Sequence, residues 1–225
     1  EYVQNHPLTQ DRIDSLQHAV DLGPQGAMPP EWIEMHRRIK AKLLGYLFPD
    51  RSLADRDDSP ATQYGHAVAW FRKHEPEKAL ALLEPLIKAE PENPYFYELK
   101  AQILFDRGRI EDSIPAYAKA AQYAPFSGLI RTAYAQSLLE SKQSREERLA
   151  EAVKQLNLAL DVEKQSSEPH RLLAIAYGKQ GHEGLSRLNL AEAAMLEGNV
   201  GFAKREAGLA RNSLPHGSPA WQRAS

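Results

Sequence analysis

One constant interval between small side chains constrains the fold of this chain more than any other feature. It separates Ala67 from Ala101, and Ala101 from Ala135. Ala79 follows Ala67 at the same offset at which Ser113 follows Ala101. Pro91 and Pro125 are separated by the same interval as the alanines. Small residues at fixed offsets predict helices that recur as closely crossing pairs, because a larger side chain would push the two helices apart.

The interval, about 34 residues, is the period of the tetratricopeptide (TPR) repeat, a pair of antiparallel helices that stacks on copies of itself. The two successive offsets that join Ala101, Ser113 and Ala120 recur near the C-terminus in Ala191, Ala203 and Ala210. Each in-phase proline stands where a second helix should end, because proline lacks an N–H and clashes with the preceding turn. We therefore predict an all-α, right-handed TPR-type solenoid of four to five helix pairs, preceded by an N-terminal helical hairpin.

The third repeat departs from the period. The next small residue after Ala135 that fits the second-helix position is Ala152. It comes later than the pattern requires, which implies an insertion of about five residues. The insertion falls in Ser141–Arg148, a polar run that we interpret as a lengthened, solvated turn, with a docking surface as the alternative. Ala174 resumes the first-helix role, and Leu185–Leu196 is predicted to close the fourth repeat and to open the fifth.

Capping residues and apolar spacing predict the helix boundaries. Thr9 can cap a helix over Gln10–Val20, and Ser59-Pro60 and Asn93-Pro94 each combine a cap with proline at the first helical position. Other helices are expected at 31–47, 77–89, 95–107, 111–123, 128–140, 148–161, 169–180, 185–197 and 200–213. The expected units are residues 1–58 (a His-Pro loop and the hairpin, ending in a polar connection over 49–58), 59–217 (the solenoid) and 218–225 (the start of a truncated capping helix).

Composition narrows the function classes. A net charge of −2 gives no electrostatic reason to expect a nucleic acid, whose binding usually requires a basic stripe. No apolar run approaches the roughly 20 residues that cross a bilayer. The absence of cysteine excludes disulfides and thiolate metal sites. Because the first residue is Glu and not Met, we expect an excised fragment.

Function in a TPR solenoid is expected on the concave wall, which the first helix of each repeat lines. The residues at the positions on this wall are aromatic, apolar and in a few cases charged. This mixture favours a mainly hydrophobic protein or peptide partner over one recognised by its terminal carboxylate. The alternative is that most of its aromatic residues are core, or touch another part of the same protein. Counted from the alanines, the groove positions are Tyr64, Val68, Phe71, Arg72, Tyr95, Leu99, Gln102, Phe105, Asp106, Thr132, Gln136, Leu139, Arg171, Ile175 and Lys179.

Catalytic motifs are missing from the sequence. A zinc peptidase of the HExxH type needs two histidines one helical turn apart. His74-Glu75 is followed by Lys78 in the second position, and His182-Glu183 by Ser186. There is also no GxSxG elbow and no phosphate-binding glycine loop. We therefore assign this chain no catalytic residue, no enzymatic activity and no cofactor of its own.

Three segments nonetheless carry a family resemblance. NHPLTQDRI, with His6-Pro7 and Arg12-Ile13, resembles the His-Pro…Arg-Ile motif that follows the catalytic domain of HtpX-like and BepA-like bacterial zinc metallopeptidases. NPYFYELKAQILFDRGR at 93–109 and GSPAWQRA at 217–224 are similar to segments of the TPR region attached to members of that family. The three segments occur in the family's order along nearly the whole chain.

The resemblance implies a zinc metalloendopeptidase whose HExxH domain lies upstream and whose TPR region docks on it and selects misfolded envelope proteins or partner complexes. It also implies a periplasmic or membrane-associated location, with zinc as the cofactor of the intact protein. His6 would then lie beside the zinc and reach it, or would only direct the start of the following helix. A free-standing TPR adaptor and an enzyme with an unrecognised groove site remain the alternatives.

Overall fold

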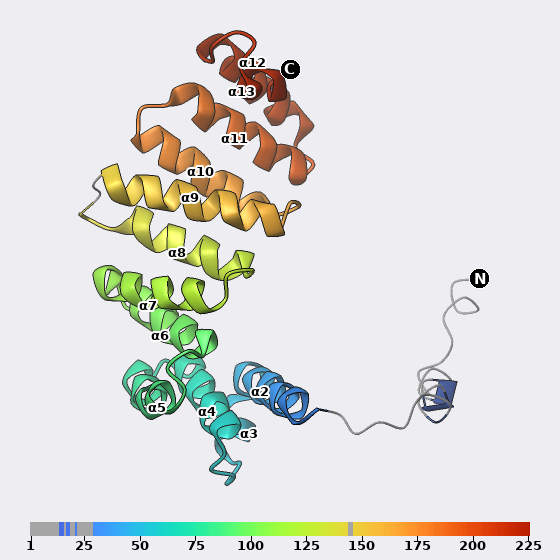
Figure 1. Ribbon diagram of the computed structural model, residues 1–225, viewed down its shortest axis with the longest axis vertical. Helices are drawn as coiled ribbons and strands as arrows, with labels where there is room; N and C mark the ends of the chain where they lie inside the picture. The colour runs from blue at the N-terminus through green and yellow to red at the C-terminus, as the bar shows by residue number, and fades with distance from the viewer. Residues whose placement is uncertain (1–13, 16, 19–20, 22–28, 144–145) are drawn as a thin grey trace.

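The computed structural model describes residues 14, 15, 17, 18, 21, 29–143 and 146–225 of the 225-residue chain. Within these residues the secondary structure is helical, with turns and no strand, and the helices stack as a column of antiparallel pairs (Figure 1). The predicted all-α, TPR-type fold is confirmed. Thr9, most of the helix predicted over Gln10–Val20, and His6 lie outside the described residues.

Every helix predicted from residue 31 onward is present, with boundaries within two residues of those expected. The helices are α2 (Pro30–Leu47), α3 (Pro49–Leu53), α4 (Pro60–Arg72), α5 (Pro76–Ala89), α6 (Pro94–Asp106), α7 (Ile110–Tyr123), α8 (Gly128–Glu140), α9 (Glu146–Val162), α10 (Ser167–Lys179), α11 (Glu183–Leu196), α12 (Val200–Ser213) and α13 (Pro219–Arg223).

Side-chain caps begin the helices where the sequence places them. The Ser59 hydroxyl accepts a hydrogen bond from the Thr62 amide at 3.3 Å, and the Asn93 side chain accepts one from the Tyr95 amide at 3.1 Å. In both helices the following residue is proline, whose missing N–H costs no hydrogen bond at the first helical position. These local interactions explain why the predicted helix starts are accurate.

The small residues of the repeated interval form the crossing points of the helix pairs. Ala67, Ala101 and Ala135 are fully buried. Each lies on the first helix of a pair, and α4–α5, α6–α7, α8–α9 and α10–α11 pack against each other. Helix α11, predicted to close the fourth repeat and to open the fifth, packs against both α10 and α12.

The insertion in the third repeat is only partly a turn. Its last residues extend α9 to 17 residues, where α5 and α7 have 14. Ser141 is buried, and its hydroxyl donates to Glu111 at the start of α7 at 2.7 Å. Arg148 also donates to Glu111 at 2.7 Å, and these contacts hold the pKa of that carboxyl below its usual value. The expectation of a solvated turn is therefore corrected for Ser141 and Arg148, which fasten α8 and α9 to α7.

Helix α2 packs against α4, so residues 30–58 are continuous with the solenoid. Large apolar side chains at helical spacing on this helix are mostly exposed: Trp32, Ile39 and Leu43 each retain more than half of their accessible surface. The face that α2 buries carries Ala41 and Gly45 instead. The connection predicted over 49–58 contains the short helix α3, whose Ser52 carbonyl is 2.8 Å from His66 Nε2.

Candidate protein-binding face

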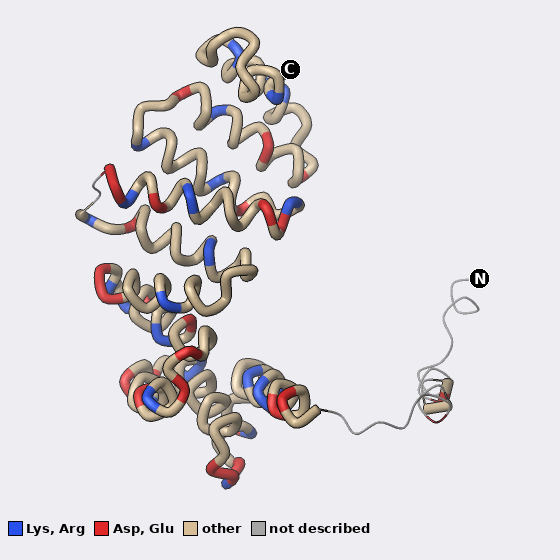
Figure 2. The backbone as a smooth tube through the Cα atoms, in the orientation of Figure 1, with Lys and Arg blue, Asp and Glu red and all other residues tan. Residues whose placement is uncertain are grey.

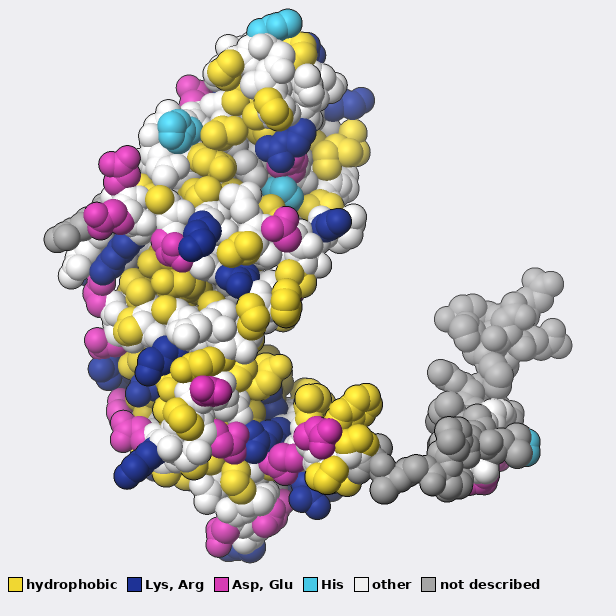
Figure 3. All heavy atoms as spheres, viewed as in Figure 1, with side chains coloured by type: hydrophobic (Ala, Val, Ile, Leu, Met, Phe, Trp, Pro, Cys, Tyr) yellow, Lys and Arg dark blue, Asp and Glu magenta, His cyan; other side chains and the backbone are white. Residues whose placement is uncertain are grey.

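The first helices of the four pairs, α4, α6, α8 and α10, carry the predicted groove positions. In Figure 3 the surface is hollowed between the column of helices and the apolar side chains of α2. Figure 2 shows Lys and Arg interspersed with Asp and Glu along the column, without a stripe of one sign. The face is therefore bounded at one end by α2, a helix that is not part of the repeat pattern.

Four predicted groove residues are core residues, which corrects the expectation that their side chains lie open on the groove. Tyr64 and Val68 of α4 and Leu99 of α6 belong to one buried cluster, and Leu139 of α8 belongs to the next. Each of the four is at most 5% exposed. They lie between helices because the buried side of a first helix is wider than a count from the crossing alanine allows.

Two further predicted residues contact α2. The Arg72 guanidinium lies over the Tyr46 ring, 4.4 Å from its centroid, and the Lys42 ammonium lies 5.7 Å from the centroid of Tyr95. Helix α2 thus covers the part of the face that belongs to α4, and its edge meets the start of α6. These contacts match the alternative that aromatic groove positions touch another part of the same chain.

The remaining predicted residues lie at the surface. Gln102, Asp106, Arg171, Ile175 and Lys179 are exposed, and Phe71, Phe105, Thr132 and Gln136 are half-buried. The polar groups of three of them have partners within the chain. Arg171 pairs with Glu197 at 2.7 Å, and Lys179 donates to the Leu139 carbonyl at 2.5 Å. Thr132 donates to the Gly128 carbonyl at 2.8 Å. Phe105 packs against the buried Ala101, Ala116 and Tyr117.

Three predicted residues meet at one end of the α4–α6 contact. Phe71, Arg72 and Asp106 line a cavity of about 370 Å³ together with His74, Pro76 and Arg107. Partial burial raises the pKa of the Asp106 carboxyl above its ordinary value. The structure thus brings three of the predicted groove residues together around one cavity.

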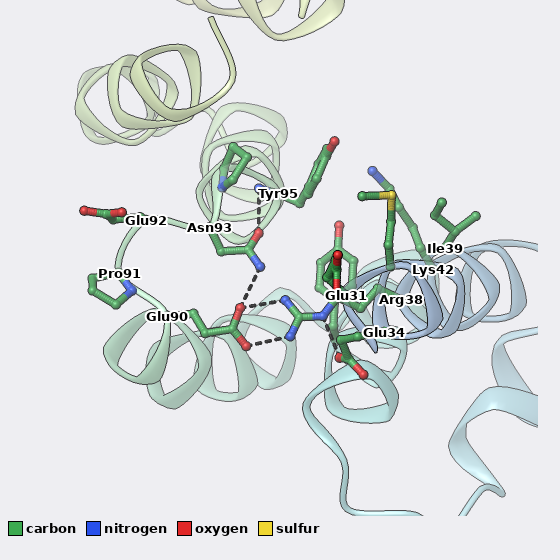
Figure 4. A pocket seen from close by; sticks show the side chains of 13 residues that line it. Glu31, Glu34, Arg38, Ile39, Lys42, Glu90, Pro91, Glu92, Asn93 and Tyr95 are labelled. Carbon is green, nitrogen blue, oxygen red and sulfur yellow. Dashed lines mark hydrogen bonds and ion pairs between the residues drawn. The ribbon is translucent and has the colours of Figure 1, made fainter. Parts of the chain in front are cut away.

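A larger cavity, of about 770 Å³, opens between α2 and the connection from α5 to α6 (Figure 4). Arg38 of α2 donates two hydrogen bonds to Glu90, at 2.6 and 2.7 Å, and one to Glu34 at 2.7 Å. These hydrogen bonds raise the pKa of Arg38 and lower that of Glu90. Asn93, which caps α6, also donates to Glu90 at 3.0 Å. One ion-pair network therefore holds α2 against the α5–α6 connection.

Sequence reasoning missed this cavity and most of its lining, although a signal was present. Ala41 and Gly45 of α2 are spaced by four residues, as are Ala61, Gly65 and Ala69 of α4. Small residues at that spacing form a flat strip along a helix and permit close backbone contact. Residues of the lining outside the prediction are Glu31, Glu34, Met35, Arg38, Ile39, Lys42, Glu90, Pro91, Glu92, Asn93 and Pro94.

The described residues do not offer a metal centre. Among residues 14–15, 17–18, 21, 29–143 and 146–225, no three His, Asp or Glu side chains converge as metal ligands would. The zinc contact expected for His6 lies outside that part of the chain. No helix in the described part is long and apolar enough to span a bilayer.

Neither a protein-family model nor a curated protein matches this sequence. Among solved structures, MamA from Desulfovibrio magneticus RS-1, from position 41 to its end, aligns with a TM-score of 0.60 and 14% identity, over 77% of this chain and 98% of that chain. MamA of MSR-1 aligns with a TM-score of 0.56 and 17% identity, over 73% and 97%. MamA is a TPR-like helical protein, and at this level of identity the similarity shows a TPR-type fold.

Proposed function

We propose that this chain is a protein-binding module whose partner lies along α6, α8 and α10, beside α2. One observation carries the proposal. Tyr95 on α6 and Leu129 on α8 occupy equivalent positions one repeat apart, and they remain 53% and 70% exposed. Ile175 on α10 is 48% exposed. Large apolar side chains that recur on successive first helices and stay in contact with water are typical of a surface that a partner covers.

We further propose that the module belongs to a bacterial zinc metallopeptidase, docks on the protease domain upstream and selects misfolded envelope substrates or partner complexes in the periplasm or at the membrane. This finer proposal rests on the ordered segments at 5–13, 93–109 and 217–224. The second segment spans α6 and the third includes α13. In the intact protein the zinc would belong to the upstream domain. A free-standing TPR adaptor is the alternative.

Site-specific crosslinking tests the protein-binding role. A photoreactive amino acid at Gln102, exposed on α6, should capture a protein in cells that express the intact protein. The same group at Gln122, exposed on the second helix α7, is the matched control. Capture that is absent from Gln102, or equal at both positions, would contradict the proposed face.

The identity of the captured product separates the two finer roles. A crosslink within one polypeptide, to a domain encoded upstream that contains HExxH, supports the metallopeptidase proposal. An upstream coding sequence without that motif, together with crosslinks only to separate polypeptides, supports the adaptor.

A further inference from the structure

The cavity between α2 and the α5–α6 connection has the chemistry of an anchoring pocket. We infer that it holds a peptide segment of the partner in which a large apolar side chain stands next to Lys or Arg. The inference rests on the proposed function and names the chemistry of the partner. Three observations support it: the apolar walls, an unpaired buried hydroxyl and the arrangement of charges.

The walls are mainly apolar and come from two sides. Met35 and Ile39 of α2 are 60% and 53% exposed, and Tyr95 of α6 is 53% exposed. Pro91 and Pro94 stiffen the connection that faces them, because the ring of proline fixes its backbone angle. With a volume of about 770 Å³ the pocket accommodates a large side chain together with its own backbone.

Tyr64 contributes a buried hydroxyl without a partner. The residue is 3% exposed and lines the pocket, and its oxygen has no hydrogen-bond partner among the described residues. Burial raises the pKa of Tyr64 above its ordinary value, so the phenol keeps its proton and can donate. Buried polar groups are nearly always hydrogen-bonded in native proteins. A peptide carbonyl that displaces the side chains covering this hydroxyl would accept its hydrogen bond.

The charges at the pocket favour a basic partner. Both cations are already engaged: Arg38 with Glu34 and Glu90, and Lys42 with Glu98 at 3.2 Å. Glu31 and Glu92 are exposed, and neither carboxylate has an ion-pair or hydrogen-bond partner in the described part of the chain (Figure 4). The lining therefore presents four carboxylates against two cations. A Lys or Arg beside the anchoring side chain would meet uncompensated negative charge.

Tyr64→Phe, in the full chain of 225 residues, removes only the hydroxyl. The probe is a fluorescein-labelled synthetic peptide, Gly-Ser-Lys-Phe-Arg-Ser-Gly, followed by fluorescence anisotropy. The variant should bind it about fivefold more weakly, the usual effect of one lost hydrogen bond. The thermal midpoint of the variant should be equal to or above that of the parent, because an unpaired buried hydroxyl is removed. A lower midpoint with unchanged peptide binding would show a structural hydroxyl and overturn the inference.

Charge variants test the second half of the inference. Glu31→Gln combined with Glu92→Gln should weaken peptide binding and reduce its dependence on salt, whereas Glu77→Gln, exposed on α5, should change neither. Peptides with Ala in place of Phe, or with Glu in place of both basic residues, should bind at least about fivefold more weakly. Equal binding of all three peptides would overturn the pocket. Self-association of the chain is measured by sedimentation. If Tyr64→Phe changed only self-association and not peptide binding, the pocket would belong to a second copy of the chain, and the inference of a separate partner would be overturned.

Crosslinking from Gln102 separates this inference from the proposed function. Capture at Gln102 without selective peptide binding at Tyr64 overturns the pocket and leaves the protein-binding role intact. Selective peptide binding without capture at Gln102 overturns the face on α6, α8 and α10 and retains the pocket.

Discussion

Gly45 of α2 and Gly65 of α4 bring two helix backbones into direct contact. A Cβ atom placed on Gly45 would lie 2.2 Å from the Gly65 carbonyl oxygen, and one placed on Gly65 would lie 2.8 Å from the Ala41 carbonyl oxygen. Side chains at these positions would occupy the same space as main-chain atoms. This close contact between the two backbones allows α2 to cover α4 and to form one wall of the pocket.

Gly45→Ala should therefore destabilise the chain by about 2 kcal/mol, in the range of overpacking substitutions, even though alanine favours helix formation. Chemical denaturation measures the change. Gly208→Ala in α12 is the matched control, because a Cβ there meets no atom within 4 Å, and it should stabilise by about 0.5 to 1 kcal/mol. A stable Gly45→Ala protein would contradict the close contact of α2 with α4.

Arg38→Ala should destabilise the chain by about 1 to 3 kcal/mol, because it removes three charge-assisted hydrogen bonds and leaves Glu90 half-buried without its cation. Arg38→Lys should recover only part of this, since an ammonium cannot form the two-pronged contact. The pKa of Glu90 is lowered in the folded state, so its contribution is present above the unfolded value of 4.5 and is lost as the pH falls through the folded value. Denaturation of Arg38→Ala should accordingly be less sensitive to acid than that of the parent.

His170 should make the C-terminal repeats more stable at mildly acidic pH. Its Nδ1 lies 3.1 Å from the Asn189 amide oxygen and 3.2 Å from a Glu192 carboxylate oxygen. Burial alone would lower the pKa of His170, and Arg223 opposes its charge, but the bonds to Glu192 and Asn189 raise the pKa overall. The stabilisation is complete below the unfolded value of 6.5 and is lost as the pH rises through the folded pKa.

Thermal unfolding between about pH 5.5 and 8.5 measures this dependence. The parent should lose stability across the interval relative to His170→Gln, which cannot titrate. Parallel curves for the two proteins would contradict the assignment to His170. Lys164 and Lys204 line the same cavity as His170 and face it from outside its own helix.

Leu129→Ser should weaken partner capture from Gln102 without unfolding the chain. Leu129 is 70% exposed at the start of α8, so its loss should change the free energy of unfolding by no more than about 0.5 kcal/mol. Leu209→Ser on α12, at 39% exposure, is the control for a general loss of apolar surface. Equal effects of the two variants on capture would argue against a face centred on the first helices.

Phe105→Ala should lower the stability of the chain, so a loss of binding in this variant would not by itself show that Phe105 contacts a partner. Phe105 packs against Ala101, Ala116 and Tyr117, so its truncation should cost about 1 to 3 kcal/mol of stability. Denaturation of this variant, compared with that of Leu129→Ser, should distinguish a packing residue from an exposed one.

The sequence by itself determined the repeat architecture of this protein, because its signals act over short distances. Ser59, Asn93 and the prolines set helix starts within one turn, and the alanine interval marks the crossings between helices that adjoin along the chain.

Only the tertiary structure decided which face of α2 is buried and which groove positions remain open. That helix offers an apolar stripe with Trp32 and Ile39 and a strip of small residues with Ala41 and Gly45, and helical spacing is common to both. Which of the two faces is buried depends on residues outside α2. Gly65 of α4 leaves room for the backbone of α2. Glu90 pairs with Arg38 across 52 residues, and Glu98 pairs with Lys42 across 56 residues. Contacts at such separations have no local period, so the folded chain alone reveals that α2 covers the first repeat and forms the pocket.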